Sequence, residues 1–212
     1  EVPEVADGTV EIKGIARDKA VILVADGNFH GRTTTLAGLS RDPLCSDGYG
    51  PATPGFVTVP YGDAAAVEKA ASKKEVCGFL VEPIQAEAGV RLPPPGYLRE
   101  VRDICTRRQV LFCADEVQTG LGRTGAMFCM DHEKVRPDLL VLGKALSGGL
   151  YPVSALIARS GILDLFAPGA HCSTYGGNPL ACAIAMATLA VVEQERLPIR
   201  AAEMGAYLLG RL

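Results

Sequence analysis

The sequence predicts an α/β fold with a mostly parallel central sheet flanked by helices. Short apolar runs alternate along the chain with amphipathic segments of helical spacing, which is the pattern of strand–helix–strand units. The chain has 212 residues, of which 48% are hydrophobic and 21% charged, so it can bury a substantial core.

Four short runs are apolar at nearly every position, as expected for strands buried on both faces of a parallel sheet. They are residues 20–25 (AVILVA), 78–82 (GFLVE), 110–115 (VLFCAD) and 139–143 (LLVLG). Residues 56–60 (FVTVP) and 153–158 (VSALIA) are weaker strand candidates.

Three segments between or after these runs have helical spacing. Residues 63–74 open with a capping aspartate, and residues 95–109 place Leu98, Val101 and Ile104 or Cys105 on one face. In residues 178–197, Asn178 can cap the helix and Pro179 can be its first residue. Residues 42–60, rich in Gly and Pro, are predicted to form a long loop that could be functional.

Composition argues against several classes of partner. The net charge is −3 and no Lys/Arg cluster occurs, so nothing indicates a nucleic-acid surface. No apolar run approaches the ~18–20 residues needed to cross a bilayer. The seven cysteines form no C-x-x-C pair, which disfavours a disulfide framework or a zinc knuckle and favours a reducing compartment. His132 and His171 are too isolated for a metal site.

Three reactive side chains stand where predicted strands end: Glu82, Asp115 and Lys144. Singly, each has an ordinary explanation, because an acid there often caps a turn and a lysine is usually solvated. Together, the Asp115 carboxylate and the Lys144 amine match what pyridoxal 5'-phosphate requires. The carboxylate keeps the pyridine nitrogen protonated, and the amine forms a Schiff base with the aldehyde.

Longer motifs agree with this chemistry. The chain resembles the class III pyridoxal phosphate-dependent aminotransferases, and among them most closely the ornithine aminotransferases, over nearly its whole length. The motifs that carry the resemblance are NFHGRTTTLAGLS, GYGPATPGF, EPIQAEAG, ADEVQTGLGRTG, LGKALSGGLYPVSA and STYGGNPLACA. The resemblance implies the large domain of aminotransferase fold type I.

The resemblance also implies cofactor roles. Lys144 matches the Schiff-base lysine, Asp115 the partner of the pyridine nitrogen, and Gln118 the residue beside the phenolic oxygen. Phe29 matches the ring that stacks on the cofactor. Ser173 and Thr174 match a pair that reaches the cofactor phosphate from the other subunit of a homodimer. Each has a simpler alternative: Phe29 as plain core, Gln118 as a turn cap, and the Ser–Thr pair as a helix cap.

Substrate-binding residues are implied in the same way. Arg32 matches an arginine that can meet a substrate carboxylate, and Glu82 a residue lining the site. Glu87 matches an acid that pairs with an arginine and helps to choose between substrates. The implied reaction moves the δ-amino group of ornithine to 2-oxoglutarate, giving glutamate 5-semialdehyde and glutamate.

Family members are roughly twice this length. We therefore expect residues 1–212 to be a large-domain fragment that lacks an N-terminal segment and a C-terminal small domain, and to be inactive alone. The expected compartment is the cytoplasm or the mitochondrial matrix. Two alternatives stay open: another class III ω-aminotransferase, acting on acetylornithine or 4-aminobutyrate, and a non-catalytic remnant of the scaffold.

Overall fold

The computed structural model describes residues 14–40, 42–159 and 161–212. The chain divides into two compact units, Glu1–Ala114 and Asp115–Leu212. None of the helices within the described ranges is both long enough and apolar enough to span a bilayer.

The first unit is built on parallel strands in the order β2-β1-β3-β4. These are β1 (Val21–Ala25), β2 (Phe56–Val59), β3 (Val76–Val81) and β4 (Leu111–Asp115), whose last residue opens the second unit. Leu23 of β1 lies opposite Val57 of β2 and Phe79 of β3, and Phe79 lies opposite Phe112 of β4. All the predicted strands of this unit are confirmed, with their ends moved by one or two residues.

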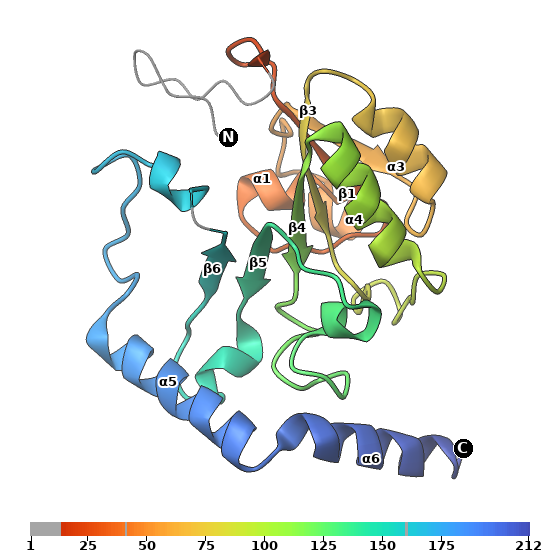
Figure 1. Cartoon of the computed structure of the whole chain (residues 1–212). Helices are drawn as coiled ribbons and strands as arrows, with labels where there is room; N and C mark the ends of the chain where they lie inside the picture. Colours follow the sequence, from red (N-terminus) through yellow and green to blue (C-terminus); the bar gives the residue numbers. More distant parts are fainter. Residues whose placement is uncertain (1–13, 41, 160) are drawn as a thin grey trace. The chain divides into compact units, whose positions relative to one another are not determined.

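The helices of the first unit are α1 (Thr34–Ala37), α2 (Pro43–Ser46), α3 (Ala64–Ala71) and α4 (Tyr97–Arg108). The α3 and α4 helices lie side by side (Figure 1), and the carboxylate of Glu68 pairs with both Arg107 and Arg108. The predicted cap of α3 is confirmed, because the Asp63 carboxylate accepts the N–H of Ala66 at 2.9 Å. The helix is shorter than predicted and ends at Ala71.

The segment 42–60 is not one long loop. Asp42 accepts the N–H of Leu44 at 3.0 Å and so caps the short helix α2, which Pro43 opens. The strand β2 then occupies residues 56–59.

Aromatic and branched apolar side chains fill the core of the first unit. Phe79 and Phe112 are fully buried on neighbouring strands, with ring centroids 6.3 Å apart. Val67 of α3 and Val101 of α4 are also fully buried. The apolar face predicted for residues 95–109 is therefore the face of α4 that packs inward.

The second unit has one antiparallel pair, β5 (Leu139–Leu142) with β6 (Ala155–Ala158). With the four parallel strands of the first unit, this gives the mostly parallel arrangement that the sequence predicted. The second unit also contains short 3-10 helices. They are η2 (Cys129–Glu133) before β5, η3 (Lys144–Ser147) between β5 and β6, and η4 (Leu163–Leu165) after β6. A small core gathers Leu121, Leu142 and Leu146 against Leu189 of the next helix.

The helix predicted over residues 178–197 is confirmed except at its last three residues. The α5 helix (Pro179–Gln194) starts as predicted, with Asn178 accepting the N–H of Ala181 at 2.9 Å. It then stops, Arg196 adopts a left-handed backbone with φ 53°, and α6 (Leu197–Leu209) begins. Pro198 explains the break, because it has no N–H to donate and its ring excludes the preceding helical turn.

Removing the ring of Phe79 tests the first core. We expect Phe79→Ala to lower the free energy of unfolding by about 3–5 kcal/mol, since it leaves a cavity against Phe112. Urea unfolding monitored by circular dichroism measures the change. The control is Leu44→Ala, because Leu44 is 88% exposed, and its effect should stay within about 0.5 kcal/mol. Equal effects of the two variants would contradict this description of the core.

Candidate active site

In the first unit, two predicted site residues meet where strands end. Glu82 directly follows β3 and is buried, and its Oε2 accepts the main-chain N–H of Phe29 at 2.9 Å. Phe29 itself lies in the loop after β1 and is half-buried rather than part of the core. The carboxylate of Glu82 thus fixes the position of the backbone that carries the Phe29 ring.

Arg32 also lies against Phe29. Its guanidinium carbon is 5.2 Å from the centroid of the Phe29 ring, within the range of a cation–π contact. The rest of the Arg32 side chain is exposed. The first unit therefore brings together Phe29 and Arg32 of the motif NFHGRTTTLAGLS and Glu82 of the motif EPIQAEAG.

Glu87 lies nearby in a different environment. It stands in the turn that joins Gln85 to Arg91, where Gln85 and Arg91 exchange two backbone hydrogen bonds. This turn packs on the loop after β1: a Cβ added to Gly27 would lie 2.6 Å from Nη1 of Arg91. The carboxylate of Glu87 is exposed at the turn, where it is free to meet a group outside this unit.

In the second unit, Asp115 and Gln118 share one turn. Asp115 is buried at the end of β4, and its Oδ1 accepts the N–H of Val117 at 3.1 Å. This bond bends the chain directly after the strand and brings Gln118, which is half-buried, to the same turn.

Lys144 follows β5 and has an unusual backbone. It is the first residue of η3, and its φ of 41° lies in the left-handed region. For a residue with a side chain this conformation costs on the order of 1–3 kcal/mol, and it persists only where the surroundings impose it. The Oγ of Ser147 donates to the carbonyl of Lys144 at 3.2 Å and accepts the N–H of Gly149 at 3.2 Å. The lysine side chain is exposed rather than enclosed within this unit.

Packing against α5 holds the turn that contains Lys144. Gly148 has φ 57°, and a Cβ built on it would lie 2.9 Å from the Oγ1 of Thr188. A larger residue would have to push η3 away from α5. Glycine is therefore required at this position both for its backbone and for its size.

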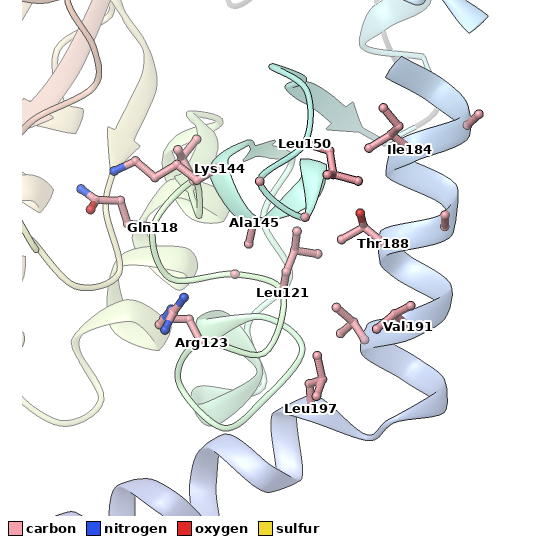
Figure 2. Close-up of a pocket in the computed structure, with 17 residues that line it drawn as sticks. Gln118, Leu121, Arg123, Lys144, Ala145, Leu150, Ile184, Thr188, Val191 and Leu197 are labelled. Carbon is pink, nitrogen blue, oxygen red and sulfur yellow. The ribbon is translucent and has the colours of Figure 1, made fainter. Parts of the chain in front are cut away.

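A cavity of about 1010 Å³ lies between this turn, the loop 117–123 and α5. Figure 2 shows Leu121, Thr188 and Val191 facing this space, whereas the polar ends of Lys144 and Gln118 extend to the other side, away from α5. The cavity is thus an apolar space behind the lysine, and the reactive amine does not point into it.

Ser173 and Thr174 are exposed on the segment that precedes α5. Ser173 accepts the N–H of Gly176 at 2.9 Å, within its own turn. The helix is capped by Asn178. The helix-cap alternative for the Ser–Thr pair is therefore wrong.

The model of the family Aminotransferase class-III matches residues 6–212. The chain belongs to the class III aminotransferases. Its sequence is 57% identical over 197 residues to the mitochondrial ornithine aminotransferase of Rattus norvegicus, covering 93% of this chain and 45% of that protein. It is 50% identical over 202 residues to the ornithine aminotransferase of Oceanobacillus iheyensis, covering 95% and 50%. The chain spans about half the length of the curated relatives it matches.

Solved structures agree with the fold. The ornithine aminotransferase of Toxoplasma gondii ME49 matches with a TM-score of 0.91 and 45% identity, over 93% of this chain and 47% of that one. Another structure of the Toxoplasma gondii enzyme has pyridoxal phosphate at partial occupancy in its active site. The acetylornithine aminotransferase of Elizabethkingia anophelis matches with a TM-score of 0.78 and 47% identity, over 93% and 45%. The fold of this class III aminotransferase chain is therefore that of aminotransferases of fold type I.

One buried acid of this class III chain was missed by sequence reasoning. Glu116 is 1% exposed, and its carboxylate accepts three hydrogen bonds from the loop that follows it. The signal was present in the motif ADEVQTG, where two acids stand side by side at a strand end. Because successive side chains of a strand point to opposite faces, only one of the two can face the site.

The part of the chain that the structure describes offers no metal-binding cluster. Across residues 14–40, 42–159 and 161–212, no group of three or more His, Cys, Asp or Glu side chains could hold a metal ion.

Cys129, at the start of η2, is shielded from solvent and lies near the charge of Glu116. Burial, reinforced by that charge, raises the pKa of the Cys129 thiol to about 12. At pH 8 its thiolate fraction is then about 10⁻⁴, and the thiolate is the form that reacts.

We expect Cys129 to resist iodoacetamide at pH 8, with a rate at least ~100-fold below that of an ordinary solvent-exposed thiol. Peptide mass mapping of the native protein measures the modified fraction at each cysteine. The same mapping in denaturant is the control and should show full modification of Cys129. Rapid native modification would mean that η2 opens readily.

Proposed function

We propose that this chain is the pyridoxal phosphate-binding large domain of an ornithine aminotransferase. The enzyme moves the δ-amino group of ornithine to 2-oxoglutarate and releases glutamate 5-semialdehyde and glutamate. The observation that carries the proposal is the strained, exposed Lys144 after β5 together with the buried Asp115 at the end of β4, in a class III chain.

The residues present fit the cofactor. Lys144 offers a primary amine on an exposed side chain, and Gln118 extends to the same side of the turn in Figure 2. Asp115 offers a buried carboxylate, which suits a protonated ring nitrogen. Pyridoxal phosphate, when bound, supplies the electron sink for the reaction. The chain holds the cofactor by Lys144 and fixes the charge of its ring by Asp115.

The other residues that the family resemblance implies lie in the first unit. Phe29 would stack on the cofactor ring, and within this unit the Arg32 guanidinium contacts the Phe29 ring while Glu82 holds the Phe29 main chain. Arg32 would meet a substrate carboxylate, and Glu87 would pair with an arginine and help to choose between substrates. The exposure of both charged groups supports these assignments.

Ornithine is favoured over other donors by the comparisons. Eight similar relatives, at 46% to 57% identity, are all ornithine aminotransferases. An acetylornithine aminotransferase also matches in structure, with a TM-score of 0.78 and 47% identity, so the preference for ornithine rests on the sequence relatives. A scaffold without activity is disfavoured because Lys144 keeps a costly backbone conformation that a remnant has no reason to retain.

We assign Ser173 and Thr174 to the cofactor phosphate of a neighbouring subunit in a homodimer. Both hydroxyls are exposed on the segment before α5, and neither caps that helix. The rat relative is mitochondrial by name, and both the mitochondrial matrix and the cytoplasm are reducing compartments that suit seven free thiols.

Cofactor attachment gives the most direct test. We expect borohydride reduction of the full-length protein with pyridoxal phosphate, followed by peptide mapping, to place the pyridoxyl group on Lys144 alone. The matched control is Lys134, another non-glycine residue with positive φ and an exposed side chain, which should stay unlabelled. Lys144→Ala should abolish both labelling and turnover. A label on a different lysine would overturn the assignment.

Asp115 tests the role of the buried carboxylate. We expect Asp115→Ala to lower kcat by about 10³-fold or more, because the ring nitrogen loses the charge that keeps it protonated. Steady-state kinetics with ornithine, acetylornithine and 4-aminobutyrate in parallel measure both the loss and the preferred donor. Near-normal turnover of the variant would contradict the role of Asp115, and a higher kcat/KM for acetylornithine or 4-aminobutyrate would reject ornithine.

A further inference from the structure

Glu116 of the second unit is an acid that is only 1% exposed, and the proposed function gives it no task. We propose that Glu116 is a positioning residue that holds Asp115, Gln118 and the strand leading to Lys144 in one fixed arrangement. This inference rests on the proposed function, and it adds a specific residue to that site.

The carboxylate of Glu116 is bonded at both oxygens. Oε1 accepts the N–H of Met130 at 2.9 Å, and Oε2 accepts the N–H of Cys129 at 2.7 Å and the hydroxyl of Thr119 at 3.0 Å. Cys129 and Met130 are the first residues of η2, so their N–H groups have no partner within that helix. Glu116 therefore ties the turn 115–119 to the start of η2.

The main chain of Glu116 makes two further bonds. Its N–H donates to the carbonyl of Val141 in β5 at 3.0 Å, and its carbonyl accepts the N–H of Gly120 at 2.9 Å. Since Lys144 follows Val141 by three residues, the same residue holds both the acid turn and the strand that delivers the lysine. Five hydrogen bonds converge on one residue.

The turn after Glu116 is also tightly packed at Gly120. A Cβ added to Gly120 would lie 2.9 Å from the carbonyl oxygen of Glu116 and 3.3 Å from Cδ2 of Leu142. The turn therefore has no room to shift toward β5. Asp115 directly precedes Glu116 and Gln118 lies two residues after it, so we expect a change at Glu116 to displace both.

Only an acid meets the demands of this position. All three side-chain partners of Glu116 are donors, and a carboxylate is an acceptor at both oxygens. A glutamine would turn its NH₂ toward a donor and leave a buried N–H without a partner. Burial opposes the charge and raises the pKa of Glu116, although the donors of Met130, Cys129 and Thr119 act in the other direction.

The test compares Glu116→Gln with Asp131→Asn in the full-length holoenzyme. Asp131 is the matched control, because its carboxylate also bonds to the start of η2, accepting the N–H of Phe128 at 3.0 Å, but from the exposed side. Three properties of each variant are measured: the steady-state kinetics, the absorption spectrum of the bound cofactor, and amide hydrogen exchange.

For Glu116→Gln we expect kcat to fall roughly 10- to 100-fold with KM nearly unchanged, because misplaced groups lose the reacting geometry. The cofactor band should shift, and exchange should accelerate at Glu116, Val117 and Gly120 as well as at Cys129 and Met130. For Asp131→Asn we expect faster exchange at Phe128 only, with kcat within about twofold of wild type.

The outcomes separate the two hypotheses. Faster exchange at Cys129 and Met130 with wild-type kcat and spectrum would overturn the positioning role and leave Glu116 a purely structural residue. If the wild-type protein fails to take up pyridoxal phosphate, the proposed function fails, and exchange at Glu116, Val117 and Gly120 still decides whether Glu116 holds the turn. Unchanged protection there would overturn the inference.

A milder variant keeps the test valid if Glu116→Gln does not fold. Thr119→Val removes one of the three side-chain bonds of Glu116 with little change of shape, and Thr119 is itself buried. We expect the same readouts to move in the same direction by a smaller amount, about threefold in kcat. No change in any of them would overturn the inference.

Discussion

Parallel pairing of the buried strands fixes where the reactive groups of the first unit lie. The β1 strand pairs with β2 and β3, and β3 pairs with β4, so all of these strands end at one edge. The loop with Phe29 and the acid Glu82 both leave from that edge, and one hydrogen bond joins them. The position of the aromatic ring therefore depends on the register of the sheet, which the buried pair of Phe79 and Phe112 stabilises.

The second unit meets a different constraint, which is to hold Lys144 in an unfavourable backbone conformation. The left-handed Lys144 is supported by Ser147 within its own turn and by the close contact between Gly148 and Thr188 of α5. Behind the turn, Leu121, Leu142 and Leu146 form a small apolar core. The strain is thus distributed over packing and hydrogen bonds that lie away from the amine, which leaves the side chain exposed for chemistry.

The acidic residues Glu82, Glu87 and Glu116 differ in their environment, and this difference indicates two kinds of role. Glu82 and Glu116 are buried and accept backbone N–H groups, so they shape loops. Glu87 is exposed at a turn and is available to a group outside its unit.

The strands, the α/β class and the places of Asp115 and Lys144 at strand ends could all be predicted from the sequence. Those features are local: a buried strand is apolar over five or six consecutive residues, and a strand-end group is recognised from its own neighbours. Even the cap Asn178 and the first turn of α5 were predicted correctly, because a cap bonds only two or three residues ahead. Local reasoning failed at Arg196, where the helical pattern continued through a break that the backbone makes before Pro198.

Only the tertiary structure decided how the two acids of ADEVQTG differ. The partners of Glu116 lie 13 and 14 residues further along the chain, and its main chain bonds to β5 at Val141. The contact of Arg32 with the Phe29 ring and the left-handed backbone of Lys144 likewise depend on the fold around them. Periodicity and spacing report which residues share a strand or a helix face. Which donor reaches a given carboxylate is decided by how distant segments meet once the chain is folded.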